Sequence, residues 1–215
     1  MSHSALGGPI RGLYGMVDLR PGDPPAGRLA GALLDGGAQI LQLRMKQASA
    51  SAMLAVVDEL RPLCRRRGAR LVVNDRLDVA LAGGADGVHL GQEDLPLAAA
   101  RQVAAAGPPG FLIGVSTHDL AQVEAALAGG ADYLGFGPVF PTGTKEHPDP
   151  VVGVAALAAV CRRAPVPVVA IGGLTLDRLD EIVAAGAAAA AVIGAVSRAP
   201  DVTAAALVVT AAFAR

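Results

Sequence analysis

The chain of 215 residues contains no tryptophan, two tyrosines, four phenylalanines and only two cysteines. Charge of either sign is not in excess, because 18 Lys and Arg residues stand against 19 Asp and Glu residues. This balance removes the main electrostatic argument for a nucleic-acid-binding protein, which would carry a basic face. Cys64 and Cys161 lie far apart with no metal-ligand spacing around either, so we expect two buried or half-buried thiols.

Long hydrophobic runs are also missing. Gly, Pro or charged residues interrupt every apolar stretch before the ~18 residues that a membrane helix needs, and residues 1–11 contain no apolar core of signal-peptide length. We therefore expect a cytoplasmic protein. Apolar residues nevertheless make up 53% of the chain, which excludes disorder and provides for a large core. One domain over 1–215 is predicted, with a loose segment over 1–11.

A repeated phrase indicates the fold. Gly36-Gly37-Ala38, Gly83-Gly84-Ala85 and Gly129-Gly130-Ala131 each precede a short apolar run, and Gly186-Ala187 is a weaker copy. The spacing of roughly 46 to 56 residues is about twice the length of a βα unit, so the phrase marks alternate strands. We interpret these pairs as helix C-caps and as places where helix and strand pack closely.

The remaining strands are predicted from apolar runs at 13–17, 70–73, 111–115 and 166–171, and helical periodicity lies between runs, as at 51–66, 120–128, 154–162 and 176–185. Strand and helix thus alternate eight times. Continuously apolar strands are typical of a parallel sheet that is buried on both faces. The sequence therefore predicts an α/β protein, a single (β/α)8 TIM barrel with its active site at the C-terminal ends of the strands.

Cationic and amide side chains gather at the end of the second predicted strand. Gln42, Arg44 and Lys46 alternate in position, so a strand would direct all three to one side. Burying two unpaired cations would cost several kcal/mol each, so we expect an anion there, with a strand end open to solvent as the alternative. Lys46 and Lys145 are the only lysines of the chain.

Two carboxylates, Asp75 and Asp94, follow the third and fourth predicted strands. Beside cations and a bound polyanion they are suited to hold Mg²⁺, which takes one or two carboxylates and completes its shell with water and phosphate oxygens. General acid–base catalysis is an alternative, and so is capping of the following helix by Asp75.

Phosphate binding is indicated by three further segments. The long loop after the sixth strand holds Thr142, Thr144 and Lys145, which are donors suited to a closing lid. Gly172-Gly173 and Gly194 follow the seventh and eighth strands, where barrels bind phosphate through backbone N–H groups, although a tight turn alone would also need glycine. Two phosphorylated groups are therefore expected in one mouth.

Together these residues resemble the thiamine phosphate synthase family. The resemblance extends from about residue 13 to 197 and rests on segments 42–46, 73–75, 85–94, 114–116, 132–145 and 169–173. The stretch Asp-Gly-Val-His-Leu-Gly-Gln-Glu-Asp at 86–94 and the loop Thr-Gly-Thr-Lys at 142–145 are specific. The resemblance implies an Mg²⁺-dependent transferase that joins hydroxymethylpyrimidine diphosphate to a thiazole phosphate, releasing pyrophosphate and making thiamine phosphate by a dissociative reaction.

The resemblance also implies a role for each candidate residue. It assigns Asp75 and Asp94 to the metal, Arg44, Lys46, Asn74 and Lys145 to the diphosphate, Gln42 and Ser116 to the pyrimidine, and Thr142, Thr144, Gly173, Ile193 and Gly194 to the thiazole phosphate or the lid. Arg44, Lys46 and Lys145 are the expected catalytic residues. The family often has a serine where this chain has Gly194.

Two other functions remain as alternatives. A thiazole tautomerase would share the barrel and use a histidine as proton shuttle, for which His118 is the candidate, but it needs no set of cations and metal ligands. A barrel that binds a phosphorylated ligand as a sensor would lack turnover. We expect His89 to pack or to support a neighbouring side chain by a hydrogen bond. No nucleic acid or membrane is expected as a partner, and assembly into a homo-oligomer is left open.

Overall fold

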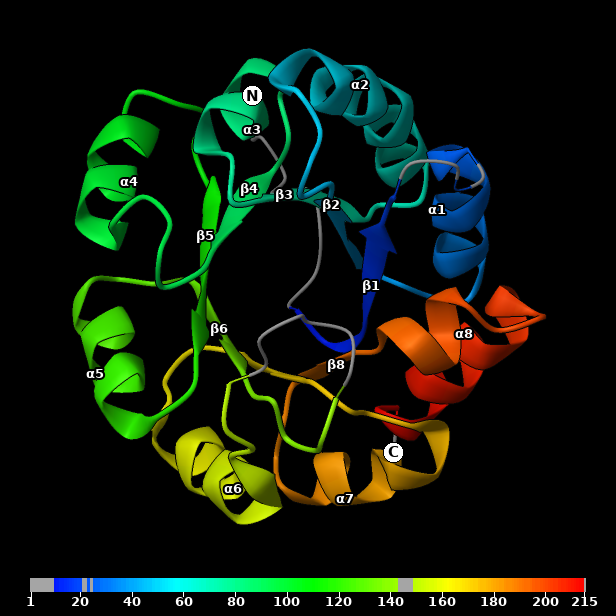
Figure 1. The fold of residues 1–215 in the computed structure, drawn as a ribbon, viewed down its shortest axis with the longest axis vertical. Helices are drawn as coiled ribbons and strands as arrows, with labels where there is room; N and C mark the ends of the chain where they lie inside the picture. Colours follow the sequence, from blue (N-terminus) through cyan, green and yellow to red (C-terminus); the bar gives the residue numbers. More distant parts are fainter. Residues whose placement is uncertain (1–9, 21–22, 24, 143–148, 215) are drawn as a thin grey trace.

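The computed structural model describes residues 10–20, 23, 25–142 and 149–214. Within them, strands and helices alternate from end to end, and the strands form a closed ring inside a ring of helices (Figure 1). The strands are β1 (Gly12–Asp18), β2 (Ile40–Arg44), β3 (Arg70–Asn74), β4 (Gly87–Leu90), β5 (Leu112–Thr117), β6 (Tyr133–Phe136), β7 (Val168–Ile171) and β8 (Ala189–Ala191). The α-helices are α1 (Ala26–Asp35), α2 (Ala50–Arg66), α3 (Leu77–Ala82), α4 (Leu97–Ala104), α5 (Leu120–Ala128), α6 (Gly153–Arg163), α7 (Leu179–Ala184) and α8 (Val202–Ala212).

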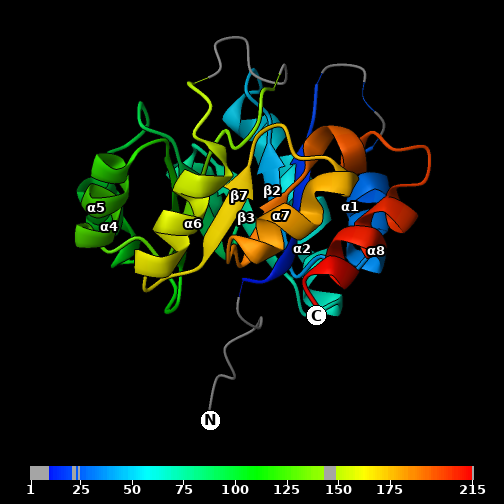
Figure 2. The ribbon, with the colours of Figure 1, turned by 90° about the horizontal axis from the view of Figure 1, so that it is seen from below.

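Each strand pairs in parallel with its neighbours in sequence, and β8 pairs with β1 to close the barrel. The strands therefore end on one face, toward which the arrow of β7 points in the side view of Figure 2. This confirms the predicted (β/α)8 barrel. The helix expected over 176–185 divides into a 3₁₀ turn, η1 (Leu176–Arg178), and α7, while a π-helical turn, η2 (Ile193–Ser197), precedes α8.

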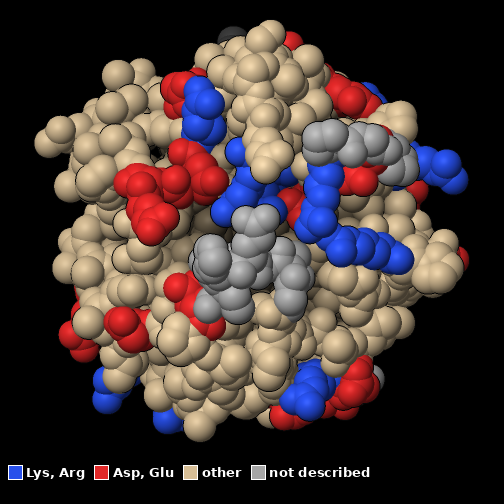
Figure 3. Space-filling view, in the orientation of Figure 1, with Lys and Arg blue, Asp and Glu red and all other residues tan. Residues whose placement is uncertain are grey.

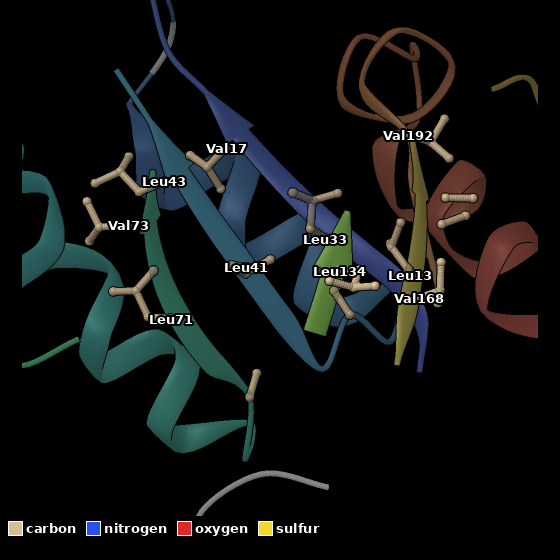
Figure 4. Packing of buried hydrophobic residues seen from close by; sticks show 14 of the residues in the cluster. Leu13, Val17, Leu33, Leu41, Leu43, Leu71, Val73, Leu134, Val168 and Val192 are labelled. Carbon is tan, nitrogen blue, oxygen red and sulfur yellow. The ribbon is translucent and has the colours of Figure 1, made fainter. Parts of the chain in front are cut away.

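Burial on both faces explains why the strands are continuously apolar. Outward side chains such as Leu41, Leu71 and Val168 pack against the surrounding helices (Figure 4). Inward side chains such as Tyr14 and Tyr133 form a separate cluster inside the barrel. Cys64 is buried and Cys161 half-buried, as expected, and no described helix is long and apolar enough to cross a membrane.

The repeated phrase is explained by packing and backbone geometry. A Cβ atom on Gly83 would lie 2.6 Å from Val57 Cγ1, so glycine permits the close approach of α2 and α3, and Gly84 adopts a left-handed φ of +64°. The aspartate that follows in two copies binds the preceding strand: Asp86 accepts from Leu71 N at 2.7 Å, and Asp132 from Ile113 N at 2.6 Å. The phrase therefore fixes architecture, as interpreted from the sequence.

Candidate active site

The C-terminal ends of β2, β3 and β5 bring together most of the described residues predicted for the site. Gln42 is buried in β2 and Arg44 ends that strand, while Asn74 ends β3 and Ser116 lies near the end of β5. Lys46 lies in the exposed turn after β2, so strand alternation accounts for Gln42 and Arg44 but not for Lys46. Figure 3 shows Lys and Arg side chains gathered over the barrel centre, with Asp and Glu side chains beside them.

Arg44 forms an ion pair that the sequence did not reveal. Its Nη1 lies 2.5 Å from Asp18 Oδ1, and the two side chains are 20% and 4% exposed. Asp18 Oδ2 is buried and lacks a hydrogen-bond partner within the described residues. The sequence does carry one signal for Asp18, because its alternation with Tyr14 and Met16 places it on the side of the strand that faces the barrel interior. The pair fixes Arg44 at the mouth while leaving part of it accessible.

The carboxylates Asp75 and Asp94 lie in hydrogen-bonding contact. Asp75 has a left-handed φ of +65°, and its amide donates to His89 O at 2.8 Å, while Asp94 Oδ2 accepts from Gly91 N at 2.6 Å. The proposed capping role of Asp75 is wrong, because Arg76 occupies the N-cap of α3 and no side-chain cap bond forms there.

Burial, together with the hydrogen bond and negative charge of Asp94, raises the pKa of Asp75 to about 7, against the lowering effects of Lys46 and Arg44. A cation between the two carboxylates would relieve this repulsion. No group of three or more His, Cys, Asp or Glu residues among the described positions could hold a metal, so other ligands would have to come from elsewhere. Two carboxylates completed by such outside ligands fit Mg²⁺, which binds through one or two carboxylates together with water and phosphate oxygens.

A chain of hydrogen bonds, buried except at its partly buried Ser116 end, links Gln42 to Ser116 through the barrel interior. Gln42 Nε2 donates to Tyr14 Oη at 2.9 Å, and the hydroxyls of Tyr14 and Tyr133 are 2.8 Å apart. Tyr133 Oη lies 3.1 Å from His89 Nδ1, and His89 Nε2 lies 2.9 Å from Ser116 Oγ. His89 thus supports a neighbouring side chain, as expected, whereas the role of the two tyrosines was missed.

The glycines after β7 have a structural reason that is independent of any ligand. A Cβ atom on Gly173 would lie 2.5 Å from Pro141 O, and Gly172 and Gly173 have φ angles of +90° and +66°. Phe140 N donates to Gly172 O at 3.0 Å, which holds the loop after β6 against the end of β7. The half-buried Thr142 ends the described part of that loop, and Thr144 and Lys145 lie outside the described residues.

The segment after β8 is open. Ile193 is half-buried and Gly194 exposed at the start of η2, and a Cβ atom on Gly194 would have no neighbour within 4 Å.

His118, the candidate proton shuttle of the tautomerase alternative, donates from Nδ1 to Gly137 O at 2.6 Å and places Nε2 3.5 Å from Asp149 Oδ2. Both of its ring nitrogens therefore face groups of the chain itself.

Comparison with known proteins identifies the relatives of this chain. A family model described as thiamine monophosphate synthase matches residues 17–196. The chain is 48% identical over 196 residues to the thiamine-phosphate synthase of Methanospirillum hungatei, covering 90% of this chain and 93% of that one. It is 48% identical over 204 residues to the thiamine-phosphate synthase of Anaeromyxobacter dehalogenans, covering 95% and 88%. The solved structure of thiamine phosphate pyrophosphorylase from Pyrococcus furiosus superimposes with a TM-score of 0.83 at 38% identity, covering 94% and 95%.

Proposed function

The chain belongs to the thiamine monophosphate synthase family, and on that premise we propose how its site makes thiamine phosphate. The enzyme is a transferase. In the proposed reaction the C–O bond between the pyrimidine methylene and its diphosphate breaks, and the bonding electrons leave with pyrophosphate. The lone pair of the thiazole nitrogen then forms the new C–N bond to the resulting pyrimidine carbocation.

The cations of the mouth assist the leaving group. Arg44 and Lys46 bind the diphosphate together with Asn74, and Lys145 adds a further charge from the loop after β6. Their effect is largest in the transition state, because negative charge accumulates on the departing pyrophosphate. Asp18 keeps Arg44 in place through the ion pair at the end of β1.

Asp75 and Asp94 would hold Mg²⁺ beside these cations. The bound ion would supply Lewis-acid stabilisation of the diphosphate oxygens. The carboxylates supply two ligands, their mutual repulsion favours a cation, and the remaining positions are left for water and substrate oxygens.

The two organic substrates are assigned to different parts of the mouth. Gln42 and Ser116 contact the pyrimidine. The thiazole phosphate is bound on the side of β6, β7 and β8 by Thr142, Thr144, Gly173, Ile193 and Gly194. A Cβ atom at Gly194 would have no neighbour within 4 Å, so this chain offers a backbone N–H and open space where the family often has a serine hydroxyl.

One observation carries this proposal: two cations at the end of β2 lie within electrostatic range of a pair of mutually repelling carboxylates. A phosphate sensor requires only one anion site, and a tautomerase requires no metal site beside a diphosphate. A cytoplasmic location and the absence of nucleic-acid partners stay predictions from the sequence.

The direct test mixes the purified protein with Mg²⁺, the pyrimidine diphosphate and the thiazole phosphate, and follows thiamine phosphate by mass spectrometry. We expect product that disappears when EDTA is added and returns with excess Mg²⁺. The variant Asp78→Asn, which removes an exposed carboxylate three residues from Asp75, serves as the matched control and should retain activity. Binding of both substrates without product would favour the sensor, and metal-independent isomerisation of a thiazole would favour the tautomerase.

A further inference from the structure

Glycines in the neighbouring strands leave space for the side chains that form the hydrogen-bonded chain between Gln42 and Ser116. A Cβ atom on Gly114 would lie 2.0 Å from Tyr133 Cζ, and one on Gly135 would lie 3.2 Å from His89 Cε1. Tyr133 and Tyr14 are 0% and 2% exposed, and His89 is 9% exposed. These polar groups therefore have little access to water and depend on one another for hydrogen bonds.

The positions of the protons along this chain follow from the end at Gln42. The amide nitrogen of Gln42 can only donate, so Tyr14 Oη accepts there. Among the described residues the other hydrogen-bond partner of this hydroxyl is Tyr133 Oη, so we assign the Tyr14 hydrogen to that contact. Tyr133 in turn donates to His89 Nδ1. Because Nδ1 accepts from Tyr133, the hydrogen of the His89 ring is on Nε2, from which it is donated to Ser116 Oγ.

This order determines what the two ends can offer a ligand. Gln42 donates one of its two amide hydrogens to Tyr14, which fixes the orientation of the amide and leaves its oxygen as an acceptor for a ligand. Ser116 already accepts from His89, which leaves its hydroxyl hydrogen as a donor. The opposite order would require the Gln42 amide to turn over, both tyrosine hydroxyls to reverse and His89 to change tautomer, all together.

We propose that Tyr14, Tyr133 and His89 are positioning residues that hold Gln42 as an acceptor and Ser116 as a donor, and so select an aminopyrimidine. The exocyclic amine would donate to the Gln42 oxygen, and the adjacent ring nitrogen would accept from Ser116. A 4-oxo pyrimidine in the same pose presents the reverse order: its carbonyl oxygen would face the Gln42 oxygen, and its ring N–H would face the hydroxyl hydrogen of Ser116. The substrate named in this inference rests on the proposed function, whereas the proton order rests on the hydrogen bonds alone.

The first test measures selectivity. We compare kcat/KM for the aminopyrimidine diphosphate with that for the 4-oxo pyrimidine diphosphate in the wild type, Tyr14→Phe and Tyr133→Phe. Removing one hydroxyl frees the two ends from each other, so each variant should lose about tenfold in selectivity, with KM for the amino substrate affected more than kcat. Ile40→Val trims a neighbouring side chain inside the barrel without touching the hydrogen bonds and should keep the wild-type selectivity.

The second test measures coupling between the ends. Tyr14→Phe and Ser116→Ala remove groups at opposite parts of the chain. If the proton order connects them, the double variant should lose clearly less kcat/KM than the product of the two single losses. Independent, multiplicative losses would overturn the proposal, and so would an unchanged selectivity in both tyrosine variants.

The third test needs no substrate. In protein labelled with ¹⁵N-histidine, the His89 resonances, identified by their absence in His89→Gln, should show the Nε2–H tautomer at neutral pH, and Tyr133→Phe should shift the Nδ1 resonance. A dominant Nδ1–H tautomer would overturn the proton order. If the wild type makes no thiamine phosphate but has the expected tautomer, the proposed function fails while the proton order stands.

Discussion

Replacing Asp75 with asparagine should produce a more stable protein that no longer turns over. The Asp75 carboxyl is half-buried against Asp94, and its pKa is raised from 3.8 to about 7. Asparagine has nearly the same shape, removes the charge and tolerates the left-handed φ of +65° better than most side chains. The substitution therefore isolates the electrostatic cost of placing a second carboxylate in the mouth.

The sign and size of the effect follow from proton linkage. Because the pKa is raised in the folded state, the folded protein binds more protons than the unfolded chain between about pH 4 and pH 7, and its stability falls as the pH rises through that window. A change of this size corresponds to at most about 4 kcal/mol at pH 8. Since the carboxyl is only half-buried, solvent screening reduces it, and we expect Asp75→Asn to gain about 1–2 kcal/mol at pH 8 and almost nothing near pH 4.

Urea unfolding in EDTA across this pH range measures the difference directly. Asp78→Asn is the control, and it should lose stability where Asp75→Asn gains it. The hydrogen bond from Arg76 lowers the pKa of Asp78, and the variant loses that interaction. Added Mg²⁺ should stabilise the wild type at pH 8 and leave Asp75→Asn unchanged, since a ligand stabilises only the state that binds it. A gap between wild type and Asp75→Asn that does not vary with pH, or a wild type that is the more stable protein at pH 8 in EDTA, would refute the reasoning.

Four further predictions concern other parts of the mouth. Arg44→Ala should lose activity and about 3 kcal/mol of stability in urea unfolding, because it leaves its buried carboxylate partner unpaired. Lys46→Ala should lose activity alone, since Lys46 is exposed, and equal stabilities of the two variants would contradict this. Gly114→Ala should cost about 1–3 kcal/mol in thermal unfolding, because its methyl group must displace a buried tyrosine ring; a neutral effect would mean that the ring has room to move. Gly194→Ser should change stability by less than about 0.5 kcal/mol and leave thiazole phosphate affinity close to wild type by calorimetry; much tighter binding would show that a hydroxyl contact is missing. Lys145→Ala should lower kcat more than it weakens thiazole phosphate binding in steady-state kinetics, and an unchanged kcat would remove this residue from the mechanism.

The barrel could be predicted from sequence because each βα unit carries its own local signals. Glycine pairs such as Gly83-Gly84 end helices by backbone conformation, and continuous apolar runs indicate strands buried on both faces. Much of the candidate site follows from the same pattern, since the C-terminal ends of parallel strands converge and polar residues there must meet. Gln42, Asp75 and Ser116 were therefore identifiable from their positions at strand ends.

The contacts within the site were not predictable in this way. Arg44 pairs with Asp18 because the register of β1 against β2 places them side by side, and register is set by the whole barrel rather than by either strand. Tyr14 and Tyr133 are 119 positions apart in sequence and meet only across the barrel interior. Alternation along a strand shows that a side chain points inward, but it does not show which inward side chains touch.

The glycines beside the buried tyrosine and histidine restrict the order in which this barrel could change during evolution. A bulky residue at position 114 excludes the ring of Tyr133, while loss of that ring leaves a void that Gly114 cannot fill. Single substitutions at either position should therefore cost stability even where the double exchange would pack well. This is epistasis between adjacent strands, and a redesign of the pyrimidine site would have to exchange positions 114 and 133 in one step.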